Sequence, residues 1–126
     1  CANATPPCAP HDDVAEILEK MVAADVIVLA TPVYFYTMCA QLKTLIDRSC
    51  PRYTAISDKE FYFILTAADS GVEAMRRTVE SLRGFTEDCL EGSRERGILY
   101  GVGAYEKGEI KALPAYREAY EMGRAV

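Results

Sequence analysis

Six consecutive residues in the first third of the chain combine a rigid proline with three aromatic rings. They are Thr31, Pro32, Val33, Tyr34, Phe35 and Tyr36. A planar multi-ring ligand needs an apolar or aromatic surface against its faces and backbone N–H and C=O groups at its polar edge. The segment offers both, because the proline stiffens it and the rings can stack. The alternative interpretation is that these rings only fill space beneath a turn between a strand and a helix.

The flanking residues predict a strand before this segment and a helix after it. Residues 26–30 form a short apolar run rich in β-branched side chains, which is typical of a strand buried on both faces. A loop over residues 31–37 follows. The apolar face of the next helix is marked by Met38, Leu42, Leu45 and Ile46. Pro51 is expected to end that helix.

The rest of the chain repeats this alternation. An amphipathic helix begins near Asp12 or Asp13, and residues 61–65 predict a second buried strand. A loop over residues 66–71 leads into another helix, and a solvated turn over residues 93–96 precedes a third strand over residues 97–103. Pro114 opens a final helix. Short connections between alternating helices and strands predict an α/β fold, an open parallel sheet with helices on both faces.

In such sheets ligands bind beyond the carboxyl ends of the strands, where the loops over residues 31–37 and 66–71 both lie. The whole chain, residues 1–126, is expected to form a single domain with an irregular lead-in over residues 1–11. No Gly-rich dinucleotide-binding motif is present, because the glycines near residue 101 are not followed by a third that opens a helix.

Composition excludes several classes of partner. The chain carries 14 Lys and Arg against 19 Asp and Glu, so nucleic acid is a disfavoured partner. Its longest uncharged stretch, residues 26–42, is shorter than the roughly 20 residues that span a bilayer, so no membrane partner is expected. Nothing resembles a secretory signal, and the five cysteines are irregularly spaced. The cytoplasm is therefore the expected location.

The chain resembles the NAD(P)H-dependent FMN reductase and iron-sulfur flavoprotein family. The specific part of the resemblance is Pro-Val-Tyr at residues 32–34, followed by Gln-Leu-Lys at 41–43 and Ile-Asp-Arg at 46–48. Supporting segments lie at residues 24–31, 66–68, 97–103, 108–110 and 119–123. The resemblance implies a flavodoxin-like fold that binds FMN, which accepts hydride from NAD(P)H and passes electrons to a flavin, quinone or other small-molecule electron acceptor.

The same resemblance assigns the expected cofactor contacts. The ring-binding loop corresponds to Thr31, Pro32, Val33, Tyr34, Phe35 and Tyr36, and a second flavin loop corresponds to Thr66, Ala67, Ala68 and Asp69. No side chain is required as an acid or base, because hydride transfer is chemistry of the cofactor. A homodimer or homotetramer is expected.

The chain departs from the family pattern at its beginning. The first strand, a Ser- and Thr-rich phosphate loop, the first helix and the second strand of the family are not found, so the fold is expected to be N-terminally incomplete. The strand over residues 26–30 would then have an unpaired apolar edge. Either upstream residues or a partner chain are expected to cover that edge.

The remaining candidates have structural interpretations. Cys1 and Cys8 resemble the last pair of cysteines around a four-iron cluster, but two thiolates do not complete such a site, so an iron-sulfur cluster is not expected. A lipid-modified Cys1 is a weaker alternative. His11 is expected to be solvated and Cys39 to pack against a helix, and no metal site is expected.

Two other functions stay open. The first is a flavin-binding electron carrier that is served by a protein partner. The second is a non-catalytic flavodoxin-like remnant that oligomerises without a cofactor. Flavin absorbance separates the remnant from the others, and bleaching by NADH or NADPH separates an enzyme from a carrier.

Overall fold

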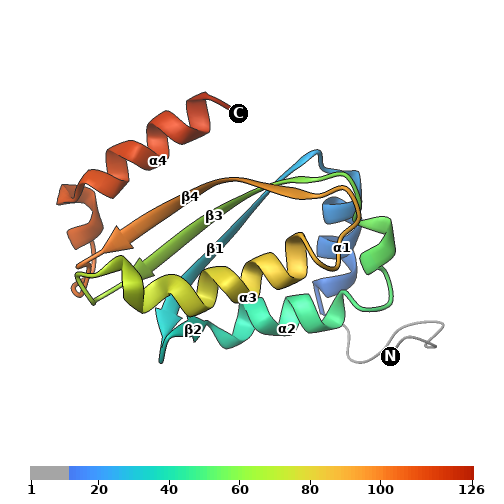
Figure 1. Ribbon diagram of the computed structural model, residues 1–126, viewed down its shortest axis with the longest axis horizontal. Coiled ribbons are helices and arrows are strands. Elements are labelled where there is room, and N and C mark those ends of the chain that lie inside the picture. The colour runs from blue at the N-terminus through green and yellow to red at the C-terminus, as the bar shows by residue number, and fades with distance from the viewer. Residues whose placement is uncertain (1–11) are drawn as a thin grey trace.

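The computed structural model of the protein describes residues 12–126. Three parallel strands form its centre, and their carboxyl ends lie at the same end of the sheet (Figure 1). They are β1 (Val26–Tyr34), β3 (Glu60–Ala67) and β4 (Arg94–Val102). The two-residue strand β2 (Thr37–Met38) pairs antiparallel with the end of β1, so the order across the sheet is β2-β1-β3-β4.

Within residues 12–126, four α-helices accompany the sheet. They are α1 (Val14–Ala23), α2 (Ala40–Arg48), α3 (Arg76–Thr86) and α4 (Pro114–Arg124), with short 3-10 helices η1 (Tyr53–Ala55), η2 (Val72–Met75) and η3 (Glu109–Ala112). Side chains from α1, α2 and α3 form a core with one face of the sheet. On the other face α4 packs so closely on β4 that a Cβ placed at Gly97 would lie 3.4 Å from Met122 Cε. The predicted α/β sheet with helices on both faces is confirmed.

The core is built from alternate residues of the strands. Ile27 and Leu29 of β1 are buried, and Phe61, Phe63 and Leu65 of β3 are completely inaccessible to solvent. Because successive strand residues point to opposite faces, these five side chains lie on the face that α1, α2 and α3 cover. The helices contribute most of the remaining core, which includes Leu18, Met21, Leu42, Met75, Val79, Leu82 and Phe85.

Several local predictions were wrong, among them the loop over residues 66–71, because Thr66 and Ala67 still belong to β3. Residues 31–34 continue β1 and are not a loop, and Met38 lies in β2 before the helix begins at Ala40. Residues 94–96 begin β4 and are not a turn, because Arg94 and Glu95 pair with Glu60 and Phe61 at the start of β3. The helix predicted after residue 71 begins later, at Arg76, and residues 72–75 form the 3-10 helix η2.

One edge of β1 is open within residues 12–126. Residues 26–32 pair with β3 on one side, and β2 pairs only with Val33 and Tyr34 on the other. This open edge explains how a strand tolerates Pro32, since its missing N–H need not serve a second neighbour. Val28 keeps 53% of its surface exposed on the same strand. No helix in the described part of the chain is long and apolar enough to cross a membrane.

Candidate functional site

A cavity of about 450 Å³ lies at the carboxyl ends of the three parallel strands. Its lining consists of Pro32, Val33, Tyr34, Thr66, Ala67, Ala68, Ala104 and Tyr105. Six of these eight residues were singled out from the sequence, three at the end of β1 and three at the end of β3. The volume lies in the usual range for small-molecule sites, and the lining is mostly apolar. Parallel pairing of β1 with β3 brings the two segments together, because Pro32 lies opposite Thr66 in the register.

The other four candidate residues lie outside this lining. Thr31 is buried, and its hydroxyl donates to the Pro32 carbonyl and accepts from the Cys39 amide at 2.9 Å. The Oδ1 atom of Asp69 accepts a 2.7 Å hydrogen bond from the Gly71 amide. Thr31 and Asp69 therefore shape the strand ends around the cavity.

Phe35 and Tyr36 form the tip of the tight turn between β1 and β2. Both have positive φ, 51° and 67°, as a two-residue hairpin turn of this hand requires. Glycine and asparagine usually occupy such positions, so two aromatic residues here imply local backbone strain. Phe35 is fully exposed, while the Tyr36 ring lies 5.5 Å from the Arg77 guanidinium carbon, a cation–π contact.

Two lining residues, Ala104 and Tyr105, were not anticipated. They follow β4, directly after Gly103, which has a φ of +75°. Backbone hydrogen bonds join their loop to the one after β3, from the Gly103 amide to the Asp69 carbonyl at 2.9 Å and from the Ala104 amide to the Ala67 carbonyl at 3.2 Å. The rule that ligands bind beyond the carboxyl ends of strands applies to β4 as well. It could therefore have indicated these two residues from the sequence.

Cys39 lies directly before α2, where the backbone amides of the first turn are free to donate. A hydrogen bond with the Thr31 hydroxyl, and then the amides of Leu42 and Gln41, hold the pKa of the Cys39 thiol below its ordinary value. The side chain also packs against the core and lines a groove between α1 and α2 rather than the 450 Å³ cavity. A lowered pKa means a larger thiolate fraction at neutral pH, and the thiolate is the nucleophile.

Removing the hydroxyl of Thr31 is expected to make Cys39 less reactive. In Thr31→Val the pKa of Cys39 should rise toward its ordinary value, so alkylation by iodoacetamide at neutral pH should slow by about 2- to 10-fold, since one pKa unit is tenfold in thiolate. Mass spectrometry of the Cys39 peptide against pH measures this. At alkaline pH the two rates should converge, and unchanged rates at neutral pH would exclude the hydroxyl as the cause.

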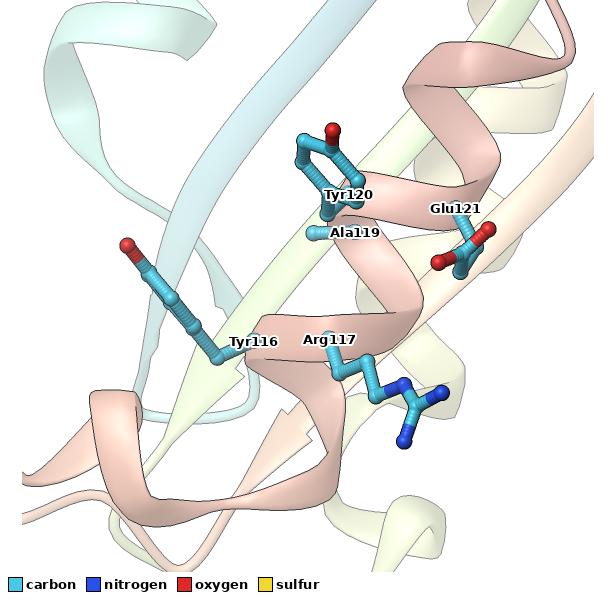
Figure 2. A pocket seen from close by; sticks show the side chains of 5 residues that line it. All are labelled: Tyr116, Arg117, Ala119, Tyr120 and Glu121. Carbon is cyan, nitrogen blue, oxygen red and sulfur yellow. The ribbon is translucent and has the colours of Figure 1, made fainter.

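A hollow of about 570 Å³ elsewhere draws its whole lining from one helix. It is lined by Tyr116, Arg117, Ala119, Tyr120 and Glu121, all from α4 (Figure 2). Figure 2 shows the two tyrosine rings projecting from this single helix, with Arg117 and Glu121 set apart from them. A face of one helix lacks the groups from several elements that mark a ligand site. The cavity at the strand ends is therefore the better candidate.

The cluster and metal candidates fall partly outside the structure. Cys1, Cys8, His11 and the predicted lead-in over residues 1–11 lie outside the described residues. Within residues 12–126 no group of three or more His, Cys, Asp or Glu side chains is arranged to hold a metal ion. Cys39, Cys50 and Cys89 are free thiols.

The sequence of the chain matches one protein family and several curated proteins. The family model of NADPH-dependent FMN reductases matches residues 1–89. The FMN-dependent NADH:quinone oxidoreductase 2 of Pseudomonas aeruginosa is 32% identical over 81% of this chain and 57% of its own length. An iron-sulfur flavoprotein of Methanocaldococcus jannaschii is 59% identical over 35% of this chain and 23% of its own length. The chain thus spans little more than half of the first relative and under a quarter of the second.

Solved structures share the fold at lower identity. The Trp repressor binding protein from Bacillus subtilis superimposes with a TM-score of 0.69 at 22% identity, over 79% of this chain and 68% of the other. An FMN-dependent NADH-azoreductase from Bacillus anthracis, solved in complex with FMN, gives a TM-score of 0.66 at 18% identity over 89% of this chain and 60% of the other. At such identities the likeness establishes the fold, which is flavodoxin-like.

Proposed function

Because the chain belongs to the NADPH-dependent FMN reductase family, we propose that it binds the ring system of FMN in the 450 Å³ cavity. In this proposal the protein is an oxidoreductase that takes hydride from NADH or NADPH and passes electrons to a small acceptor such as a quinone or a second flavin. The observation that carries the proposal is the convergence of residues from the ends of β1, β3 and β4 on one mostly apolar cavity.

The residues present suit a planar ring. Pro32, Val33 and Tyr34 offer a rigid apolar and aromatic wall, and Ala67 and Ala68 leave room for close approach to the backbone opposite. Together they would orient the ring and exclude water from its faces. FMN, when bound, supplies the hydride chemistry itself, so none of these side chains is assigned a proton-transfer role.

The residues that line the cavity suit the ring system of FMN rather than the whole cofactor. Residues 12–126 contain no Ser- and Thr-rich loop opening a helix after a strand, the usual site for a phosphate group. The proposal therefore assigns the isoalloxazine ring to the cavity and no phosphate contact to the described residues. Riboflavin, which has the ring without the phosphate, is then expected to bind this chain as tightly as FMN, to within about threefold.

Titration of the purified chain with FMN and riboflavin, followed by quenching of flavin fluorescence, tests binding. Anaerobic bleaching of the bound flavin by NADH or NADPH tests the reaction. Binding without bleaching by either nucleotide would favour an electron carrier served by a protein partner. Failure to bind either flavin would reject the proposal and leave the non-catalytic interpretation.

We also propose that the chain forms a homo-oligomer through β1. Support comes from the strand edge over residues 26–32, which is unpaired within the described residues, and from the half-exposed Val28. Such an apolar edge readily pairs with another strand, whereas charged side chains on an edge oppose pairing. Sedimentation should show an oligomer for the wild-type chain and a smaller species for Val28→Lys. A wild-type monomer would reject this proposal.

A further inference from the structure

The loop after β4 places an aromatic ring at the cavity. Tyr105 lines the cavity, yet 81% of its surface stays exposed. A side chain that is both part of a ligand site and mostly uncovered has apolar area still available for burial. An aromatic ring in that position suits a planar ligand, because offset stacking stabilises pairs of rings beyond simple burial.

A carboxylate holds this loop in place. The Oε2 atom of Glu109 accepts hydrogen bonds from two consecutive backbone amides, those of Tyr105 and Glu106, each at 2.9 Å. The Glu109 amide in turn donates to the Glu106 carbonyl at 3.1 Å. The amides of Glu106 and Tyr105 also hold the pKa of Glu109 below its ordinary value, so the carboxylate keeps its charge at neutral pH.

Both ends of the loop are fixed to the sheet. Before Tyr105, the Gly103 and Ala104 amides donate to carbonyls of the loop after β3. After Glu109, the side chain of Ile110 packs over β4, since a Cβ placed at Gly101 would lie 3.0 Å from Ile110 Cδ1. Glu109 therefore closes a short loop between two anchored points, and the backbone at Tyr105 has little freedom.

We propose that Tyr105 is a ring-contacting residue of the flavin site and that Glu109 positions it by binding the amides of Tyr105 and Glu106. This inference rests on the proposed function, since it assumes that a flavin ring occupies the cavity. It adds a third wall from the loop after β4 to the walls formed by the ends of β1 and β3.

The first test needs no flavin. Hydrogen exchange of the Tyr105 and Glu106 amides should be about 2- to 10-fold faster in Glu109→Ala than in the wild type, because each amide loses its acceptor. Glu109→Gln keeps a side-chain oxygen and should restore part of the protection. Glu106→Ala is the matched control, because it removes the same charge from the same loop and leaves Glu109 in place. Equal exchange in Glu109→Ala and wild type would overturn the role of Glu109.

The second test measures the dissociation constant of FMN. Tyr105→Ala should weaken binding by about 3- to 10-fold, whereas Tyr105→Phe, which keeps the ring, should stay near wild type. Tyr120→Ala on α4 removes a ring that is also mostly exposed but does not line the cavity, and it should leave binding unchanged.

The double variant separates positioning from a direct contact. If Glu109 acts through Tyr105, Tyr105→Ala combined with Glu109→Ala should bind FMN no more weakly than Tyr105→Ala alone. Additive losses would show that Glu109 acts independently and would overturn its positioning role. If the wild-type chain binds FMN, and Tyr105→Ala and Tyr120→Ala have the same dissociation constant for FMN, the role of Tyr105 is overturned. The proposed function would then stay intact.

Discussion

Replacing Phe63 with alanine is expected to lower the free energy of unfolding by about 3–5 kcal/mol. Phe63 is completely buried at the middle of β3, which pairs with both β1 and β4. Its ring packs in the single core that the sheet shares with α1, α2 and α3. The loss combines the transfer of a large apolar side chain with a cavity that flanking strands cannot collapse to fill. Urea unfolding followed by circular dichroism measures it.

The same substitution at Phe35 is the matched control. Phe35 is fully exposed at the hairpin tip, so Phe35→Ala is expected to change the free energy of unfolding by no more than about 0.5 kcal/mol. Phe63→Leu removes less volume and should cost less than Phe63→Ala. Similar losses at Phe63 and Phe35 would contradict the assignment of the core. The free energy of unfolding of small proteins is about 5–15 kcal/mol. Phe63→Ala should therefore shift the midpoint of the urea unfolding curve by a large amount.

The order of elements could be predicted from the sequence because each carries its own period. Continuous apolar runs marked β1 and β3, stripes of apolar residues marked α1 and α2, and Pro114 marked the start of α4. The boundaries of the strands depended instead on how neighbouring strands pair. Residues 31–34 carry a proline, which normally indicates a loop, but an edge strand with one paired side tolerates it. Residues 94–96 are charged, yet they belong to β4 because Arg94 and Glu95 pair with residues of β3.

The candidate site was predictable where it follows a recognisable strand. The segments at the ends of β1 and β3 were found in this way, and Pro32 to Tyr34 and Thr66 to Ala68 do line one cavity. The turn at Phe35 and Tyr36 was not predictable, because neither residue type favours positive φ and only the antiparallel pairing of β2 imposes it. Tyr105 depends on Glu109, four residues further along, and such a contact leaves no periodic pattern in the sequence.

A substitution that fills the cavity should weaken flavin binding while leaving the free energy of unfolding almost unchanged. Ala68 lines the cavity and is exposed in the structure, outside the apolar core. In Ala68→Phe the added ring should occupy space that the flavin ring needs, and FMN and riboflavin should both bind about 10- to 100-fold more weakly, a loss of about 1.4–2.8 kcal/mol. The free energy of unfolding should change by no more than about 0.5 kcal/mol, as is usual for exposed positions. Flavin fluorescence and urea unfolding measure the two quantities.

The control for this variant is Ala55→Phe. Ala55 is also exposed, but it lies in η1 between α2 and the start of β3, at the amino ends of the strands. The same added ring there should leave flavin binding at the wild-type level. If Ala68→Phe binds both flavins as well as Ala55→Phe does, the ring is not held in this cavity. A parallel loss for FMN and riboflavin, by contrast, assigns the effect to the ring, because the two ligands differ only in the phosphate.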